Sequence, residues 1–302
     1  MRERGILKLF SQTEKLSIDR DSKIVFLSDA HRGDGGRRDT LIGNRNIYIS
    51  ALKYYYKEEY TLVEIGDGDE LWKNKNMINI SYNYKEVFRI LNRFRVKKKL
   101  YMLYGNHDIK KRNKNFAETQ NKAFKKIKKN FGEECLELIN NTEFLEGIVL
   151  DYKPYNKEIL VMHGHQMDLW NNELWMVSRF LVRHLWKYLE GVAGFKEPIT
   201  PANNYNKGGM IDKRLNDFAN KNKKMIVCGH THDAVFPDVG EGLYFNDGCC
   251  VNPQEITTIE INKGVIALIK WSIEINEGNF LYIKRNVIKG PERLEDYLEF
   301  VK

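Results

Sequence analysis

Cysteine is scarce in this chain of 302 residues, and long apolar runs are missing. The four cysteines show no CxxC spacing, so we expect reduced thiols rather than a disulfide framework. No stretch approaches the ~20 apolar residues of a membrane span. The opening segment, MRERGILKLFSQTEKLS, mixes charges with its apolar residues and lacks the continuous apolar stretch of a secretory signal. We therefore expect a cytoplasmic protein without a transmembrane segment, with a peripheral place at the membrane as an alternative.

The charge balance is basic, with a formal net charge of +8. Lysines gather at 97–99, 110–114, 122–129 and 221–224, and such groups can indicate a surface that binds nucleic acid. Because lysine is abundant along the whole chain, a solvated helix face is the more frequent meaning of such groups. We therefore favour a small phosphorylated substrate, lipidic ones included, over nucleic acid. The sequence leaves the oligomeric state open.

Short apolar runs alternate with helix-like segments in the first half of the chain. The runs at 23–28, 60–65 and 99–104 are separated by helical patterns near 40–57 and 81–95, and further runs lie at 158–162 and 224–228. This order builds a largely parallel sheet, whose ligands collect at the carboxyl ends of the strands.

A different pattern follows His232, where strand-like segments succeed one another without long helices. They lie at 243–245, 256–261, 265–275 and 280–288, with hairpin turns at 262–264 and 276–279. We expect these strands to form an antiparallel sheet packed on the first. Residues 291–300 would then form a closing helix.

Histidines and carboxylates cluster where the apolar runs end. Six of the seven histidines lie in four short motifs, and a fifth motif adds carboxylates: SDAH at 28–31, GDGDELW at 66–72, GNHD at 105–108, MHGH at 162–165 and GHTH at 229–232. Aspartate, asparagine and histidine drawn from distant parts of a chain are what a pair of divalent metals needs. A mixed oxygen and imidazole shell suits manganese, iron or zinc. The sequence therefore predicts a dinuclear metal hydrolase.

The order D-x-H, GD-x-x-[DE], GNHD, H-x-H, G-H-x-H resembles the calcineurin-like metallophosphoesterase superfamily over roughly residues 24–250. The resemblance implies an α/β fold, a four-layer αββα sandwich, in a single domain of residues 1–302. It also implies two divalent metal ions, with manganese favoured and iron or zinc as alternatives. Carried over to this chain, it places Asp29, His31 and His232 on the first ion, Asn106, His163 and His230 on the second, and Asp67 between the two.

The same resemblance leaves His107 outside the ligand set. We expect His107 to donate a proton to the leaving oxygen and Asp108 to orient it, as a carboxylate does for an imidazole. Two metals hold a bridging water, lower its pKa and stabilise an in-line displacement at phosphorus. The predicted reaction is therefore direct attack of a metal-bridging hydroxide, without a phosphoenzyme.

The second motif bears on the substrate. Protein phosphatases of the superfamily carry an arginine after its second acidic residue, where this chain has Leu71. The form GD-x-x-E-x-W instead resembles the UDP-2,3-diacylglucosamine pyrophosphatase branch, in which a helical lid lies between the fourth and fifth motifs. Residues 166–222 are rich in aromatics, so we expect a helical lid insertion there, and packing of its apolar face on the body explains these aromatics equally well.

Departures from that branch point to a substrate of its own. His165 stands where the branch has an aspartate, and the lysine-rich segment 111–146 is extra. We expect cleavage of a phosphodiester or diphosphate bond in a small nucleotide-linked or lipid-linked molecule.

Four residues are candidate substrate contacts. Arg32 follows His31 in a glycine-rich loop, where a guanidinium can fork onto phosphate oxygens, and an ordinary surface loop is the alternative. His165 orients His163, touches substrate or fills its loop. Arg179 and Arg183, four apart on the predicted lid helix, can reach the site from above.

Three other functions stay open at this point. A metal-dependent nuclease would use the same metals with the lysine clusters along the nucleic-acid backbone. A phosphomonoesterase or protein phosphatase lacks its arginine here. A non-catalytic scaffold would have lost ligands, whereas all seven predicted ligands are present.

Overall fold

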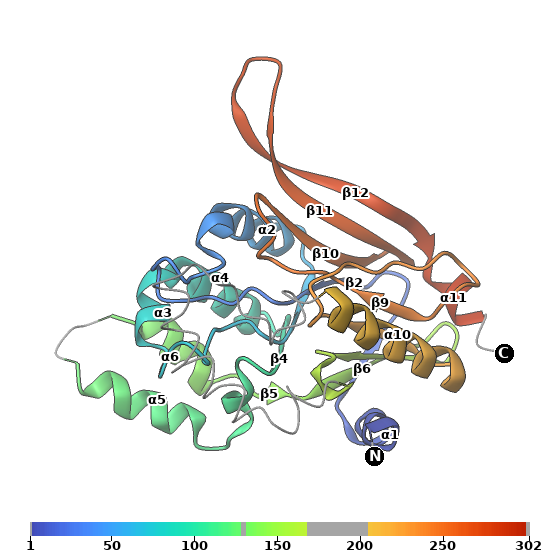
Figure 1. The fold of residues 1–302 in the computed structure, drawn as a ribbon, viewed down its shortest axis with the longest axis horizontal. Helices are drawn as coiled ribbons and strands as arrows, with labels where there is room; N and C mark the ends of the chain where they lie inside the picture. The colour runs from blue at the N-terminus through green and yellow to red at the C-terminus, as the bar shows by residue number, and fades with distance from the viewer. Residues whose placement is uncertain (1, 128–130, 168–204, 300–302) are drawn as a thin grey trace.

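A computed structural model gives the fold and describes residues 2–127, 131–167 and 205–299 (Figure 1). The helices of this part of the chain are α1 (Arg2–Gln12), α2 (Arg45–Lys57), α3 (Ile78–Asn83), α4 (Lys85–Val96), α5 (Phe116–Lys125), α6 (Glu133–Asn140), α10 (Tyr205–Asn222) and α11 (Leu294–Glu299), with one-turn helices η1 (Ile42–Asn44), η2 (Ile109–Arg112) and η3 (His165–Met167). The strands are β1 (Lys15–Ile18), β2 (Lys23–Leu27), β3 (Thr61–Ile65), β4 (Leu100–Leu103), β5 (Phe144–Leu145), β6 (Gly147–Tyr152), β7 (Lys157–Met162), β8 (Met225–Cys228), β9 (Tyr244–Asn246), β10 (Glu255–Asn262), β11 (Val265–Ile275) and β12 (Leu281–Arg293).

Two β-sheets form the centre of the fold. The first has the strand order β12-β11-β10-β2-β3-β4-β5, and the second has the order β1-β6-β7-β8-β9. Strands β2 to β5 are parallel neighbours, as the alternation of strands and helices predicts.

The predicted assignment of the late strands to a separate sheet holds for β9, which lies in the second sheet, but is wrong for β10, β11 and β12. β10 pairs antiparallel with β2, with Ile259 opposite Phe26, so β10, β11 and β12 extend the first sheet. The physical reason is hydrogen bonding, because six successive residues of β10 are buried and their backbone groups need partners at both edges, which β2 and β11 supply. The second sheet instead forms from β6 paired with β1 and β7, and from β8, which pairs with β7 and β9.

Side chains of β2 alternate between two cores. Ile24 and Phe26 belong to the core shared with the second sheet, whereas Val25 and Leu27 pack into the core that contains α2 and α4. This is the period-two alternation of a strand with a layer on each face. Helices α1 and α10 contribute to the core of the second sheet, so the layers are helix, sheet, sheet, helix. The α/β sandwich predicted from the sequence is confirmed.

Helix α10 forms the last part of residues 166–222, the segment predicted to be a lid. Its Ile211, Leu215 and Phe218 recur every three to four residues and are buried in the core of the second sheet. Residues 205–222 are thus part of the outer helical layer. The rest of the interval, 168–204, lies outside the described residues, and so do Arg179 and Arg183.

The β11–β12 hairpin projects from the body as a long twisted arm (Figure 1). Apolar side chains near its tip, Ile275, Phe280 and Leu281, are exposed. β12 continues to Arg293, so the closing helix α11 starts later than the expected 291. Within the described ranges, no helix has the length and apolar character to cross a membrane.

Candidate metal centre

The loops after β2, β3 and β8 leave their strands through an unusual backbone conformation. Five residues have positive φ there: Asp29 (50°), His31 (49°), Asp67 (50°), His230 (76°) and His232 (66°). Non-glycine residues rarely adopt this region, which costs on the order of 1–3 kcal/mol each and is concentrated at functional sites. The break in the strand alternation lets residues two positions apart turn toward one point. The sequence carried the residue types but gave no sign of the strain.

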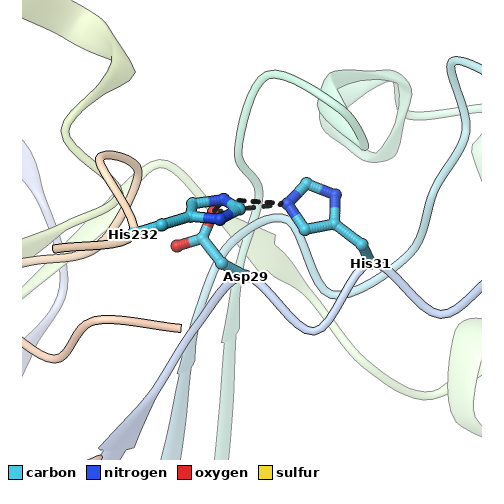
Figure 2. A group of neighbouring side chains, drawn as sticks. All are labelled: Asp29, His31 and His232. Atoms are coloured by element: carbon cyan, nitrogen blue, oxygen red, sulfur yellow. Dashed lines mark hydrogen bonds and ion pairs between the residues drawn. The ribbon is translucent and has the colours of Figure 1, made fainter. Parts of the chain in front are cut away.

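Asp29, His31 and His232 form a first cluster of ligand atoms (Figure 2). The Nε2 atoms of His31 and His232 lie 3.2 Å apart. Asp29 Oδ1 lies 3.5 Å from His31 Nε2 and 3.1 Å from His232 Nε2. Ligand atoms about 2.1 Å from one ion in a tetrahedral shell lie roughly 3.4 Å from each other. The spacing of these three atoms therefore fits a single transition-metal ion.

The second oxygen of Asp29 is held by the protein. Asp29 Oδ2 accepts a hydrogen bond from the His230 backbone N–H at 2.8 Å and another from Ser28 Oγ at 2.6 Å. Its Oδ1 accepts none and is buried. Ser28 Oγ also lies 2.6 Å from Asp247 Oδ1, a carboxyl whose pKa is raised well above its usual value by burial. Ser28 and Asp247 thus support the site; Ser28 begins the SDAH motif without a role predicted for it, and Asp247 lies outside all five motifs.

A second cluster contains Asp67, Asn106, His163 and His230. His163 Nε2 lies 3.3 Å from Asp67 Oδ2 and 3.3 Å from Asn106 Oδ1, and His230 offers a ligand atom to the same group. His163 Nδ1 donates to the Ile65 carbonyl at 2.7 Å, which assigns the proton to Nδ1 and turns the Nε2 lone pair toward the cluster.

Asp67 stands between the two clusters. Its Oδ2 lies 3.3 Å from His163 Nε2 in the second cluster and 3.9 Å from His31 Nε2 in the first. Its Oδ1 accepts the His107 backbone N–H at 2.7 Å. Gly105 makes this approach feasible, because a Cβ at Gly105 would lie 2.7 Å from the carboxylate carbon of Asp67. This is where a ligand to two ions would stand.

The clusters favour positive charge. Burial lowers the pKa of His31, but Asp29 and Glu70 outweigh it and raise that pKa to about 10. Burial also lowers the pKa of His163, and Asp67 and Asp29 raise it to about 9. The pKa of Asp67 stays well below its usual value although burial opposes this, because the charges of His163 and His107 outweigh the desolvation. The donor set therefore fits divalent cations. Such cations would take the place of the protons that the neighbouring carboxylates stabilise on His31 and His163.

Residues 22–234 match the family model of the calcineurin-like phosphoesterases. The chain belongs to this family. Metal-dependent hydrolysis of phosphoesters is the general activity of the family, and the buried histidine and aspartate clusters of this phosphoesterase agree with it.

Curated proteins provide no match to this phosphoesterase. Among solved structures, the crystal structure of Chaetomium thermophilum Vps29 is similar to it, with a TM-score of 0.38 and 9% sequence identity over 89% of this chain and 96% of that chain.

The partner of His107 in the phosphoesterase differs from the expectation. His107 Nδ1 lies 3.0 and 3.1 Å from the two carboxylate oxygens of Glu70, and its ring stacks on Trp72 at 4.0 Å between centroids. The prediction that Asp108 orients His107 is therefore wrong. Asp108 instead accepts the Gly105 N–H at 2.8 Å and the Lys111 ammonium at 2.7 Å, so it shapes the GNHD turn.

Glu70 and Trp72 are site residues that the motifs only partly signalled. Glu70 is the second acidic residue of GD-x-x-E, but its place beside His107 depends on how two loops meet. Burial raises the pKa of Glu70, and the charge of His107 and hydrogen bonds from His107 and His31 hold it well below its usual value. Trp72 Nε1 donates to the Asn106 carbonyl at 2.6 Å. The indole thus ties the second motif to the third beneath the His107 ring.

Arg32 is buried in ion pairs, which corrects its predicted role as a substrate contact. The side chain is 0% exposed, its Nε donates to Asp69 at 2.8 Å, and its two terminal nitrogens bond Glu64. Burial lowers the pKa of Arg32, but Asp69 and Glu64 hold it well above its usual value. Lys111 also pairs with Asp69, at 2.7 Å. A charged Glu64 inside the apolar run 60–65 was the available signal, because a buried charge requires a partner.

His165 is buried beside the second cluster. Its ring centroid lies 5.5 Å from that of His163 and 6.4 Å from that of His230, and Tyr104 lies on another side at 6.5 Å. The structure brings together the seven predicted ligands, His107 and His165. Arg32 and the Asp108 carboxylate instead bind other partners, Glu64 and Asp69 for Arg32 and Lys111 for Asp108.

Proposed function

We propose that this phosphoesterase binds two divalent ions and hydrolyses a phosphodiester or diphosphate bond of a small nucleotide-linked or lipid-linked substrate by direct attack of water. The observation that carries the proposal is the position of Asp67, whose Oδ2 is near ligand atoms of both clusters. One cluster alone would suit a single ion. Two clusters that share a carboxylate suit a pair.

The proposed ions would divide the ligands between them. The first ion would be held by Asp29, His31 and His232, the second by Asn106, His163 and His230, and both by Asp67. When bound, such ions lower the pKa of the attacking water and stabilise charge on the phosphoryl oxygens. We favour manganese, with iron or zinc as alternatives, because the ligands mix oxygen with imidazole.

His107 would deliver the proton to the leaving oxygen. Glu70 accepts from Nδ1 of the ring, and the stacked indole of Trp72 fixes the ring plane, so Nε2 is left for proton transfer. A ring that is already fixed on two sides loses little rotational entropy when it reaches the transition state. Glu70 and Trp72 are thus positioning residues for His107.

The bond class follows from what surrounds the second motif. Leu71, at the position where protein phosphatases of the superfamily carry an arginine, is 1% exposed. Arg32, the arginine next to His31, is committed to Glu64 and Asp69. Neither position therefore supplies a guanidinium for the terminal dianion of a phosphomonoester. This supports a diester or diphosphate as the substrate.

Hydrolysis assays with added manganese test the proposal. We expect cleavage of bis-p-nitrophenyl phosphate or of a UDP-sugar, slow cleavage of p-nitrophenyl phosphate, and loss of all activity in Asp67→Ala. Cleavage of the monoester alone would replace the proposal with a phosphomonoesterase. Activity that survives in Asp67→Ala would contradict the metal assignment.

A further inference from the structure

A closed ring of hydrogen bonds adjoins the GHTH loop and contains none of the seven ligands. Its members are Asp212 on α10, Thr231 in the loop, and Tyr244 and Asn246 on β9. Tyr244 and Asn246 are two positions apart on one strand, so their side chains lie on the same face of the sheet. The ring therefore joins a helix, a strand and the ligand loop. We call these four residues the Asp212 ring.

The two hydroxyl groups of the Asp212 ring donate on one side and accept on the other. Asp212 Oδ1 accepts the Thr231 hydroxyl at 2.9 Å and the Tyr244 hydroxyl at 2.6 Å. Asn246 Nδ2 donates to both hydroxyl oxygens, at 3.0 Å for Thr231 and 2.9 Å for Tyr244. The same amide nitrogen donates to the Gly229 carbonyl at 2.8 Å, in the ligand loop. Removal of one hydroxyl therefore takes a partner from both of its neighbours.

Thr231 stands between two ligands whose backbone is strained. His230 and His232 have positive φ, 76° and 66°, and a non-glycine residue stays in this region only where its surroundings hold it there. The side chain of Thr231 is the anchor that the Asp212 ring provides, so it limits how far either histidine can turn. His230 belongs to the second cluster, whereas His232 belongs to the first (Figure 2). One anchor thus serves a ligand of each cluster.

The Asp212 ring is set in apolar surroundings. Tyr244 is buried in the core that also contains Ile211 and Leu215, which lie on either side of Asp212 in α10. In such surroundings a hydrogen bond is stronger than in water, and an unpaired polar group costs more. The complete ring is therefore rigid, and it loosens when one member loses its partners.

We infer that the Asp212 ring sets the affinity for both metal ions at once, by holding His230 and His232 in the conformation in which they bind. Its members are positioning residues and would touch neither ion. The inference rests on the proposed function, because it requires that both clusters bind metal. A ligand such as His232 differs from the ring, since its loss should affect one ion only.

Calorimetric titration with manganese tests the inference in Thr231→Val and Thr231→Ser. Valine keeps the branched shape and removes the hydroxyl, whereas serine keeps the hydroxyl. Replacing a residue that orients a metal ligand typically costs about 10–100-fold in metal affinity. We expect Thr231→Val to bind both ions more weakly by that factor, and Thr231→Ser to bind them like wild type.

Thr258→Val is the matched control. The buried Thr258 hydroxyl lies 2.8 Å from that of Tyr55, which donates to Glu260, and none of these residues is a ligand. Both valine variants should lower the free energy of unfolding of the metal-free protein in urea, because each loses a buried hydroxyl. Only Thr231→Val should weaken manganese binding.

A variant on α10 opens the same ring from its other side. Asp212→Leu removes the acceptor of both hydroxyls and should weaken binding of both ions as Thr231→Val does. The double variant should be no weaker than either single variant, because one change already opens the ring. Additive losses would mean that Asp212 and Thr231 act separately.

Wild-type affinity for both ions in Thr231→Val, or equal weakening in Thr258→Val, would overturn the inference. Weaker binding of one ion alone would also overturn it, since the ring would then hold only one histidine. Two ions bound by wild type and unaffected by Thr231→Val would leave the proposed function standing. A wild-type protein that binds no manganese would remove the proposed function and the inference with it.

Discussion

Replacing Glu70 with glutamine tests whether this carboxylate works through His107. Glu70 contacts His107 Nδ1 at 3.0 and 3.1 Å, and glutamine keeps the shape of the side chain while removing its charge. A hydrogen bond to a charged group contributes about 1.5–3 kcal/mol, which corresponds to a factor of roughly 10–150 in rate at about 1.4 kcal/mol per decade. We therefore expect kcat for bis-p-nitrophenyl phosphate to fall by that factor.

A double-mutant cycle makes this prediction sharper. His107→Ala should lower kcat by ~10²–10⁴-fold, as removal of a general acid does, with both metals retained. In that background Glu70→Gln should have almost no further effect, because its target is gone. Metal content is measured for each variant, since Glu70 also lies 3.7 Å from His31 Nδ1. Additive losses, or loss of metal in His107→Ala, would refute the assignment of Glu70 and His107.

Three further predictions concern the surroundings of the site. Arg32→Met should lower the free energy of unfolding in urea by about 3–5 kcal/mol, because it leaves Glu64 buried without its cationic partner and Asp69 with Lys111 alone. Arg20→Met should change it little, because Arg20 is largely exposed and its partner Glu295 keeps Arg293. An unchanged urea midpoint in Arg32→Met would contradict the buried network. Gly105→Ala should reduce bound metal, measured by mass spectrometry, because the added methyl group overlaps the Asp67 carboxylate, and full occupancy would argue against this contact. Manganese affinity measured by calorimetry should strengthen from pH 6 to pH 9, because the raised pKa values of His31 and His163 mean that protons must leave before the ions bind. An affinity that does not vary with pH would be inconsistent with this proton competition.

The sequence predicted the parts of the site that depend on residue type and on strand ends. Asp29, Asp67 and His163 follow apolar runs, and parallel strands deliver their ends to one edge of a sheet, so their convergence follows from local pattern alone. The family resemblance predicted the two-sheet sandwich. It did not predict that β10 pairs with β2 and so belongs to the first sheet. Strand pairing joins residues far apart in the chain, as with Ile259 and Phe26, and spacing does not encode it.

The errors of contact have the same origin. Asp108 and Glu70 are both carboxylates in motifs, and it is Glu70, from another loop, that contacts the His107 ring. Arg32 was predicted to contact substrate because it follows His31 in the sequence. Its guanidinium instead pairs with Glu64, 32 positions away.

Metal stoichiometry tests the shared carboxylate most directly. Wild-type protein loaded with manganese and freed of excess metal is compared by mass spectrometry with Asp67→Ala and with His232→Ala, a ligand of the first cluster only. We expect about two ions per chain in wild type, about one in His232→Ala, and close to none in Asp67→Ala, with each variant shown to be folded by circular dichroism. A single ion in wild type, or two ions retained in Asp67→Ala, would contradict a pair of metals bridged by Asp67.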